Sequence, residues 1–321
     1  MFEVRPTRRT SFREDWTQLA LFRRQRSVGA DSPPTGLQTA SVKDEFAGPP
    51  DLGLSHLNEI QRVGLRDDVI AGFYRNDTRE IYPGVHLGVN DVLVDVGCGS
   101  GGVLEFCQRY AGKIFALDID AEALSAVSSR AQFSGAENIS FVRASAEQLP
   151  LTTGTGTKVL CLEVLEHVDY PELVVSELFR IGQPGCIYLI SVPGQFSESM
   201  MQKVAPREIF EKPHHIRIFS QTEFSSMVER SGLKILSESS SGAFSTIFFA
   251  MYWKKFDTQP GQSFEAVNPE ISHHDPLLQD WAKAWNHLLD LPNGEDIKRM
   301  LDTLIPKSQI IVAVKPDLSA V

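Results

Sequence analysis

Residues 92–102 read Val-Leu-Val-Asp-Val-Gly-Cys-Gly-Ser-Gly-Gly, a short apolar run followed by a glycine-rich turn. The apolar run predicts a buried strand, and the spacing of apolar residues after the glycines predicts a helix over 101–111. Glycines at such a turn let the backbone approach a ligand closely, and the start of the helix offers unpaired N–H groups. The stretch therefore predicts a strand–turn–helix unit that binds a small ligand.

The same alternation continues along the chain. The predicted strands lie at 114–117, 139–142, 159–162 and 186–192, and the predicted helices between them lie at 121–133 and 170–181. Continuous apolar strands separated by amphipathic helices are typical of a parallel sheet covered on both faces, so the sequence predicts a doubly wound α/β domain. Beyond Pro193 we expect a loop, then a helix at 221–231 and strands at 233–237 and 309–314.

Composition argues against several other classes of protein. The 321 residues are 42% apolar, enough for a large core, and the net charge of −10 disfavours nucleic acid and anionic membranes as partners. The longest apolar stretch, 244–253, is about half the ~20 residues that a membrane-spanning helix needs. The cysteines lack CxxC spacing, which argues against a disulfide scaffold or a zinc ribbon and favours a reducing, cytoplasmic compartment. They are Cys98, Cys107, Cys161 and Cys186.

Segments outside the α/β pattern predict additional parts. Seven arginines in the first thirty residues indicate a charged arm, so any anionic partner is expected at residues 1–26. Ser55 is a good N-cap for a helix at 56–75. The expected division is an Arg-rich arm and flexible linker at 1–53, an N-terminal helical cover at 54–90, the core at 91–242, an insertion at 243–307 with helices at 277–290 and 294–304, and the last strand and tail at 308–321.

Two aspartates indicate which ligand the glycine turn holds. Asp95, two residues before the turn, would repel a pyrophosphate but would accept an ammonium group. Asp118 follows Gly97 by twenty-one residues, at the end of the second predicted strand, where a carboxylate can accept both hydroxyl groups of a ribose. A nucleoside joined to an amino acid without a pyrophosphate describes S-adenosylmethionine.

With these residues the chain resembles the class I S-adenosylmethionine-dependent methyltransferases over residues 88–240, and it is similar to small-molecule O-methyltransferases of the ubiquinone pathway. The resemblance implies a Rossmann-like, seven-stranded, mostly parallel sheet with an antiparallel last strand. It also implies that the glycine loop cradles the methionine end, that Asp118 holds the ribose, and that Leu162 offers its carbonyl to the ammonium group. The implied cofactor-binding residues are Asp95, Gly97, Cys98, Gly99, Gly101, Asp118, Ile119, Ser145, Ala146, Glu147 and Leu162.

One of these residues departs from the family pattern. Ser145 stands where the family normally has an acidic residue that accepts from the adenine amino group. A serine oxygen can still accept that hydrogen bond, and the alternative is that Ser145 is a plain turn residue.

The catalytic prediction rests on the end of the fourth predicted strand. Glu163, Glu166 and His167 have i, i+3, i+4 spacing and would share one face if the segment were helical. The same pattern occurs in the resembling O-methyltransferases, together with a second stretch that contains His215, and it favours oxygen as the methyl acceptor. Three interpretations remain open: a structural role for these residues, general-base catalysis by His167 or His215, and a divalent metal ion held by both glutamates and both histidines.

The aromatic stretch within 244–255 has two interpretations as well. A helix that is apolar on all sides is usually part of a core, and the alternative is a cover over the acceptor or a peripheral contact with a membrane. The sequence as a whole predicts an S-adenosylmethionine-dependent methyltransferase that acts on a small molecule, most simply at a hydroxyl group. A thiol or carboxylate acceptor, or a module that binds the cofactor without turnover, is the alternative.

Overall fold

A computed structural model describes residues 58–256 and 274–317 of the chain. The predictions for the Arg-rich arm, the linker and Ser55 lie outside the described residues. The same holds for most of the polar segment between 257 and 276.

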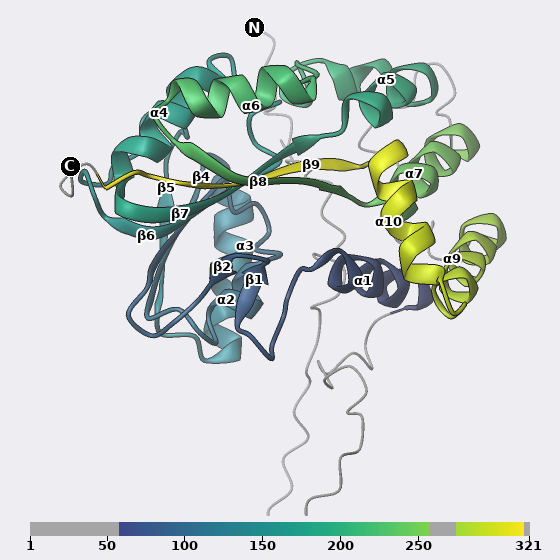
Figure 1. Cartoon of the computed structure of the whole chain (residues 1–321), viewed down its shortest axis with the longest axis horizontal. Coiled ribbons are helices and arrows are strands. Elements are labelled where there is room, and N and C mark those ends of the chain that lie inside the picture. The colour runs from purple at the N-terminus through teal and green to yellow at the C-terminus, as the bar shows by residue number, and fades with distance from the viewer. Residues whose placement is uncertain (1–57, 257–273, 318–321) are drawn as a thin grey trace, which may run out of the picture.

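A seven-stranded sheet forms the centre of the molecule, in the order β5-β4-β3-β6-β7-β9-β8 (Figure 1). Neighbouring strands pair in parallel except at β9, which is antiparallel to both β7 and β8. The strands are β3 (Val92–Val96), β4 (Lys113–Asp118), β5 (Ile139–Arg143), β6 (Gly156–Leu162), β7 (Gly182–Pro193), β8 (Lys234–Ser241) and β9 (Ser308–Val314). This topology confirms the predicted Rossmann-like, doubly wound fold with an antiparallel last strand.

Helices cover both faces of the sheet (Figure 1). Helices α4 (Pro171–Ile181) and α6 (Gln221–Arg230) lie on one face, and α2 (Leu104–Cys107) and α3 (Ala121–Ser134) lie on the other. The helix predicted over 101–111 is reduced to the single turn α2. The chain beyond it forms turns whose carbonyl groups at Gln108 and Ala111 accept hydrogen bonds from the side chain of Asn138.

The segment before the sheet is only partly the predicted helical cover. Helix α1 (Glu59–Ala71) begins at a capping box formed by Asn58 and Gln61, so its N-cap is Asn58 and not Ser55. It is followed by an unpredicted hairpin of β1 (Glu80–Tyr82) and β2 (Val85–His86). Strands this short leave almost no periodic pattern in a sequence.

A helix also replaces the loop expected after Pro193. Helix α5 (Gln195–Val204) is followed by a 3-10 helix at Arg207–Phe210. Helix α5 buries a narrow and mostly polar stripe, of which Ser197 and Glu198 are part. That composition explains why its sequence does not look like a core-facing helix.

The predicted insertion forms helices α7 (Ala243–Lys255), α9 (Pro276–Leu289) and α10 (Gly294–Leu304), which pack together with α1. We call these four helices the cap. The cap has an apolar cluster of its own, in which Phe244 and Trp253 are at most 1% exposed. The aromatic stretch is therefore core, and the prediction of a membrane contact through 244–255 is wrong for these buried rings.

Buried charges tie the cap together. The ammonium group of Lys298, fully buried, donates to Asp302 at 2.5 Å and lies 3.4 Å from Asp67 of α1. The indole N–H of Trp285 donates to Asp67 at 2.8 Å, and the N–H of Ala243 donates to Asp302 at 2.9 Å. Burial raises the pKa of Asp67 to about 6. The network connects all four helices of the cap.

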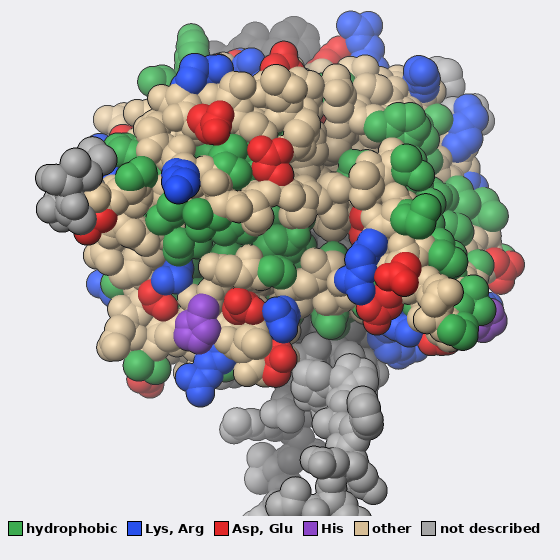
Figure 2. Space-filling view, viewed as in Figure 1, with side chains coloured by type: hydrophobic (Ala, Val, Ile, Leu, Met, Phe, Trp, Pro, Cys, Tyr) green, Lys and Arg blue, Asp and Glu red, His purple; other side chains and the backbone are tan. Residues whose placement is uncertain are grey.

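The face drawn in Figure 2 carries interspersed acidic and basic side chains, and hydrophobic side chains gather over α10. On that helix Met300 and Leu304 are 65% and 66% exposed. Among the described residues, no helix combines the length and apolar character needed to cross a bilayer.

Candidate active site

A cavity opens where the glycine loop, the end of β6 and the cap meet. It brings together most of the residues that the sequence analysis selected. From the core it is lined by Asp95, Gly97, Cys98, Leu162, Glu163, Glu166, His167, Ser191 and His215. From the cap and the segments that lead to it, the lining includes Gly64, Asp68, Ser241, Gly242, Ser245 and Lys307.

The glycine loop has the backbone conformation that only glycine adopts without strain. Gly97, Gly99 and Gly101 have φ angles of 75°, 52° and 81°. A Cβ atom at Gly101 would lie 2.8 Å from a methyl group of Val127. The N–H groups of Gly97 and Cys98 both donate to the carbonyl of Leu117, at 2.7 and 2.9 Å. The loop is thus held against the end of β4.

Asp118 is joined to this loop. Its carboxylate accepts from the N–H of Gly99 at 2.7 Å and from the N–H of Asp120 at 3.0 Å, and the side chain is buried. These contacts hold the carboxylate beside the turn, where the predicted ribose would lie. Asp118 therefore has a structural contact with the loop that its sequence position alone did not indicate.

The predicted adenine-binding residues lie outside the cavity lining. Ile119 is 65% exposed, and Ser145 accepts a hydrogen bond from the N–H of Glu147 at 3.2 Å. The carboxylate of Glu147 in turn accepts from the N–H of Tyr170 at 3.0 Å. The hydroxyl group of Ser145 thus closes a local turn, as the interpretation of Ser145 as a turn residue predicts. The contacts of Ile119, Ser145, Ala146 and Glu147 with an adenine stay predictions.

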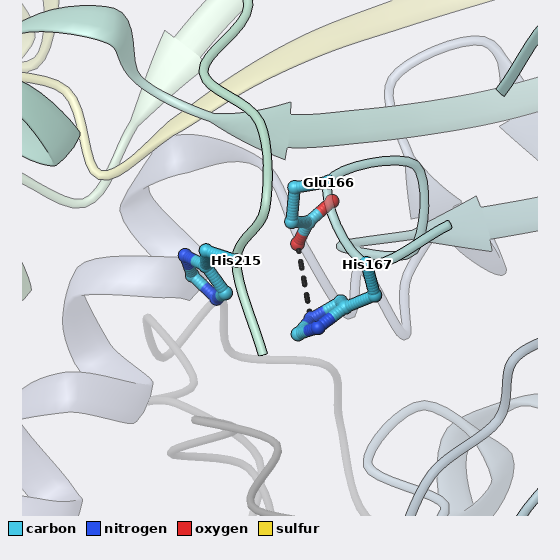
Figure 3. A group of neighbouring side chains, drawn as sticks. All are labelled: Glu166, His167 and His215. Atoms are coloured by element: carbon cyan, nitrogen blue, oxygen red, sulfur yellow. Dashed lines mark ion pairs between the residues drawn. The ribbon is translucent and has the colours of Figure 1, made fainter. Parts of the chain in front are cut away.

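The segment after β6 is a series of turns, so the helical face expected for Glu163, Glu166 and His167 does not form. Glu163 has a φ angle of 54°, and its carboxylate accepts from Ser191 at 2.7 Å and from Lys307 at 2.9 Å. It therefore does not join the other three residues of the predicted four-ligand set. The potential ligand atoms of Glu166, His167 and His215 all lie within 4.8 Å of one another (Figure 3).

Glu166 is fully buried, and neither of its carboxylate oxygens has a hydrogen-bond partner. One oxygen lies 3.6 Å from Nε2 of His167 (Figure 3). Burial raises the pKa of the Glu166 carboxyl group to about 8, and the negative charge of Glu163 contributes to the rise. A carboxyl group with this pKa can hold or release a proton near neutral pH.

Each histidine has a partner on Nδ1. His215 pairs with the buried carboxylate of Glu198 on α5 at 2.8 Å, and His167 lies 3.3 Å from the carbonyl oxygen of Pro213. Because both partners are acceptors, we assign the proton of each neutral ring to Nδ1 and the lone pair to Nε2. The two rings meet edge to face, with centroids 4.8 Å apart.

The sequence analysis missed Glu198, Lys307 and Ser191. Glu198 lies in the segment expected to be a loop, and Lys307 contacts a residue 144 positions away. No motif spacing connects residues that meet only through the tertiary fold. In the sequence, Lys307 is marked only as the single lysine between α10 and the last strand, and this position alone does not predict a contact with the site.

The fold, the glycine loop and Asp118 have the arrangement that the sequence analysis predicts for S-adenosylmethionine-dependent methyltransferases. In agreement, a family model described as a methyltransferase domain matches residues 94–190. Residues 94–190 are thus similar to methyltransferase domains.

Curated relatives are similar to part of the chain. A ubiquinone biosynthesis O-methyltransferase of Psychrobacter cryohalolentis is 25% identical over 158 residues, which are 48% of this chain and 60% of that protein. A probable S-adenosylmethionine-dependent methyltransferase of Mycolicibacterium smegmatis is 27% identical over 145 residues, 45% of this chain and 52% of that one. The chain thus spans little more than half the length of these relatives. A solved putative methyltransferase from Bacillus halodurans is 19% identical, with a TM-score of 0.49, over 72% of this chain and 95% of that one.

Proposed function

We propose that the protein transfers the methyl group of S-adenosylmethionine to a hydroxyl oxygen of a small molecule. The observation that carries this proposal is the Glu198–His215 pair beside Glu166, in the same cavity as the glycine loop. A hydroxyl group is a weak nucleophile until its proton is removed, so a base next to the cofactor is what this reaction requires. The name of the Psychrobacter relative agrees with oxygen as the acceptor.

The proposed reaction is a single displacement. An acceptor oxygen forms a bond to the methyl carbon, the carbon–sulfur bond breaks with its electron pair remaining on sulfur, and the hydroxyl proton passes to His215. The carboxylate of Glu198, 2.8 Å from Nδ1, stabilises the positive charge that His215 then carries. His167 and Glu166 lie next to this proton and can pass it on toward the solvent.

In a second version of the same proposal, a divalent metal ion activates the acceptor hydroxyl group. Glu166, His167 and His215 offer one carboxylate and two imidazoles, a donor set that suits such an ion, and a buried carboxylate without a hydrogen-bond partner is consistent with it. The ion would acidify a bound hydroxyl group. Glu163 is not a ligand in this version because its carboxylate is engaged by Lys307 and Ser191.

The test uses the full chain with S-adenosylmethionine labelled on the methyl group. Acceptors that carry a phenolic hydroxyl, a thiol or a carboxylate are compared by mass spectrometry of the products. We expect methylation at oxygen and a loss of at least 100-fold in kcat for His215→Gln, with S-adenosylhomocysteine binding unchanged. A chelator that removes activity, with Mg²⁺ restoring it, would select the metal version.

Other outcomes would select the alternatives. A thiol or carboxylate acceptor needs little proton removal, so activity unaffected by changes at both histidines would contradict oxygen as the acceptor. Cofactor binding without turnover for any acceptor would indicate a binding module. We also propose the cytoplasm as the working compartment, because all four cysteines are buried free thiols.

A further inference from the structure

Glu163, the first residue after β6, has a backbone conformation that is unusual for its type. Its φ angle of 54° lies in the left-handed region, which among the described residues only two other non-glycine residues share, Tyr74 and Arg79. This conformation costs free energy for a residue with a Cβ atom, and it persists where the surroundings hold it in place. Because Glu163 also lines the cavity, the unusual conformation belongs to the site.

Ser191 and Lys307 hold Glu163 in this conformation. The N–H of Glu163 donates to the carbonyl and to the hydroxyl oxygen of Ser191, at 3.1 and 3.2 Å. The hydroxyl group of Ser191 donates to one oxygen of the Glu163 carboxylate at 2.7 Å, and the ammonium group of Lys307 donates to the other at 2.9 Å. The side chains of Glu163 and Lys307 are 25% and 19% exposed, so water and salt screen the ion pair only in part.

The backbone of Lys307 is itself fixed, at the point where β9 begins. Its N–H donates to the carbonyl of Ser241, the last residue of β8, at 2.9 Å. Its carbonyl accepts from the N–H of Gly194, just after β7, at 2.7 Å. A Cβ atom at Gly242 would lie 2.8 Å from the Cβ atom of Lys307, so the two segments are in close contact. The lysine therefore reaches the turn after β6 from a fixed position in the sheet.

The turn that Glu163 begins carries two residues of the proposed proton transfer. Glu166 and His167 follow Glu163 by three and four positions, in a segment made of turns. The carbonyl of Glu166 accepts from the N–H of Ile216, the neighbour of His215, at 2.9 Å. Because the φ angle of Glu163 sets the direction in which the chain leaves β6, it also sets where Glu166 and His167 lie relative to His215 (Figure 3).

From these contacts we propose that Lys307 is a positioning residue. Through its ion pair with Glu163 it holds the turn after β6, so that Glu166 and His167 meet His215. The inference rests on the proposed function, because that function gives these three side chains the proton of the acceptor. Lys307 lies 144 positions after Glu163, so the pair connects the segment that follows the cap with the catalytic turn of the core.

Two variants at Glu163 separate the effect of the backbone from the effect of the charge. Glu163→Ala and Glu163→Gly remove the same carboxylate, but only glycine adopts a φ angle of 54° without strain. The readout is the imidazole carbon–proton NMR signals of the full chain, assigned with His167→Gln and His215→Gln, and it needs no acceptor. We expect Glu163→Ala and Lys307→Met to shift the signals of both histidines, and Glu163→Gly to shift them much less. Adding Lys307→Met to Glu163→Gly should cause no further shift.

Activity toward a phenolic acceptor that the original chain methylates is the second readout. We expect kcat to fall about 10- to 100-fold in Glu163→Ala and Lys307→Met, with little change in KM for S-adenosylmethionine, and most of the loss to be recovered in Glu163→Gly. Lys307→Arg keeps a cation and should fall between the original chain and Lys307→Met. Lys158→Met breaks an ion pair of the same length, 2.9 Å to Asp91, near the start of β6. It is the matched control and should leave kcat and both histidine signals unchanged.

Unchanged histidine signals and kcat in Lys307→Met would overturn the inference, because the ion pair would then contribute to stability alone. Equal shifts in Glu163→Ala and Glu163→Gly would also overturn it, because the carboxylate and not the backbone conformation would then be required. If Lys307→Met does not fold, Lys307→Arg and the two variants at Glu163 carry the same test. The proposed function fails separately, if the original chain methylates no hydroxyl acceptor, and the NMR comparison still decides the role of Lys307.

Discussion

Replacing Glu166 by glutamine should stabilise the protein, and the gain should grow with pH. The folded protein holds this carboxyl group with a pKa of about 8, against 4.5 for the ordinary group, chiefly because of burial. Between these two values the unfolded chain has released the proton while the folded protein still holds it. Each pH unit in that window then lowers the free energy of unfolding by about 1.4 kcal/mol.

The size of the effect follows from this window. The pKa difference of 3.5 units corresponds to about 5 kcal/mol at pH 8 and about 3 kcal/mol at pH 7, and to almost nothing at pH 4.5. Glutamine has nearly the same shape and no charge, so the variant loses the pH-dependent cost and keeps the packing. Because the pKa of this carboxyl group is raised in the folded protein, its contribution lowers the free energy of unfolding as the pH rises from 4.5 to 8. Above pH 8 that contribution is constant.

Urea unfolding at pH 5, 6, 7 and 8 measures the difference between Glu166→Gln and the original protein. Glu229→Gln on α6, the same substitution at an exposed position, is the matched control. A stability difference that stays flat from pH 5 to 8, or a glutamine variant that is less stable at pH 8, would refute the reasoning. We also expect Glu166→Gln to be less active than the original protein, because a buried carboxyl group that lowers stability is retained where function requires it.

Three further predictions concern the loop, the cap and the base. Glu198→Gln should lower kcat about 10- to 100-fold without changing cofactor binding and should move the acidic limb of the pH–rate profile to lower pH; partial rescue by Glu198→Asp supports a positioning role, whereas an unchanged profile argues against it. Gly101→Ala should abolish S-adenosylhomocysteine binding in a calorimetric titration, because the new methyl group meets Val127 at 2.8 Å in a backbone conformation strained for alanine. Lys298→Met should cost about 3–5 kcal/mol of stability in urea unfolding by leaving Asp67 and Asp302 without their cation; a loss below 1 kcal/mol would mean that the network is unimportant.

The sequence predicted the sheet well because buried parallel strands are continuous apolar runs. The prediction for β3 matches residue for residue, and the glycine loop follows it directly in the chain. Such local patterns can be recognised in a sequence without any knowledge of the tertiary fold. Helix α5 was missed for the opposite reason, since the stripe it buries includes Ser197 and Glu198 and has little apolar character.

The parts of the site that the sequence did not reveal belong to the acceptor side. The cofactor side is built from contiguous motifs between β3 and β6, whereas the acceptor side is assembled from contacts between distant segments, such as Glu198 with His215 and Glu163 with Lys307.

The region matched by the methyltransferase family model, residues 94–190, ends before α5 and excludes the whole cap. The similarity therefore covers the segment for which we predict S-adenosylmethionine binding and leaves out the helices of the cap, which line the other side of the cavity. Two proteins can share that region and methylate different compounds, because the cap-side residues that line the cavity lie elsewhere in the chain. The acceptor of this protein therefore has to be sought from the residues that the cap contributes to the cavity, and not from the substrates of its relatives.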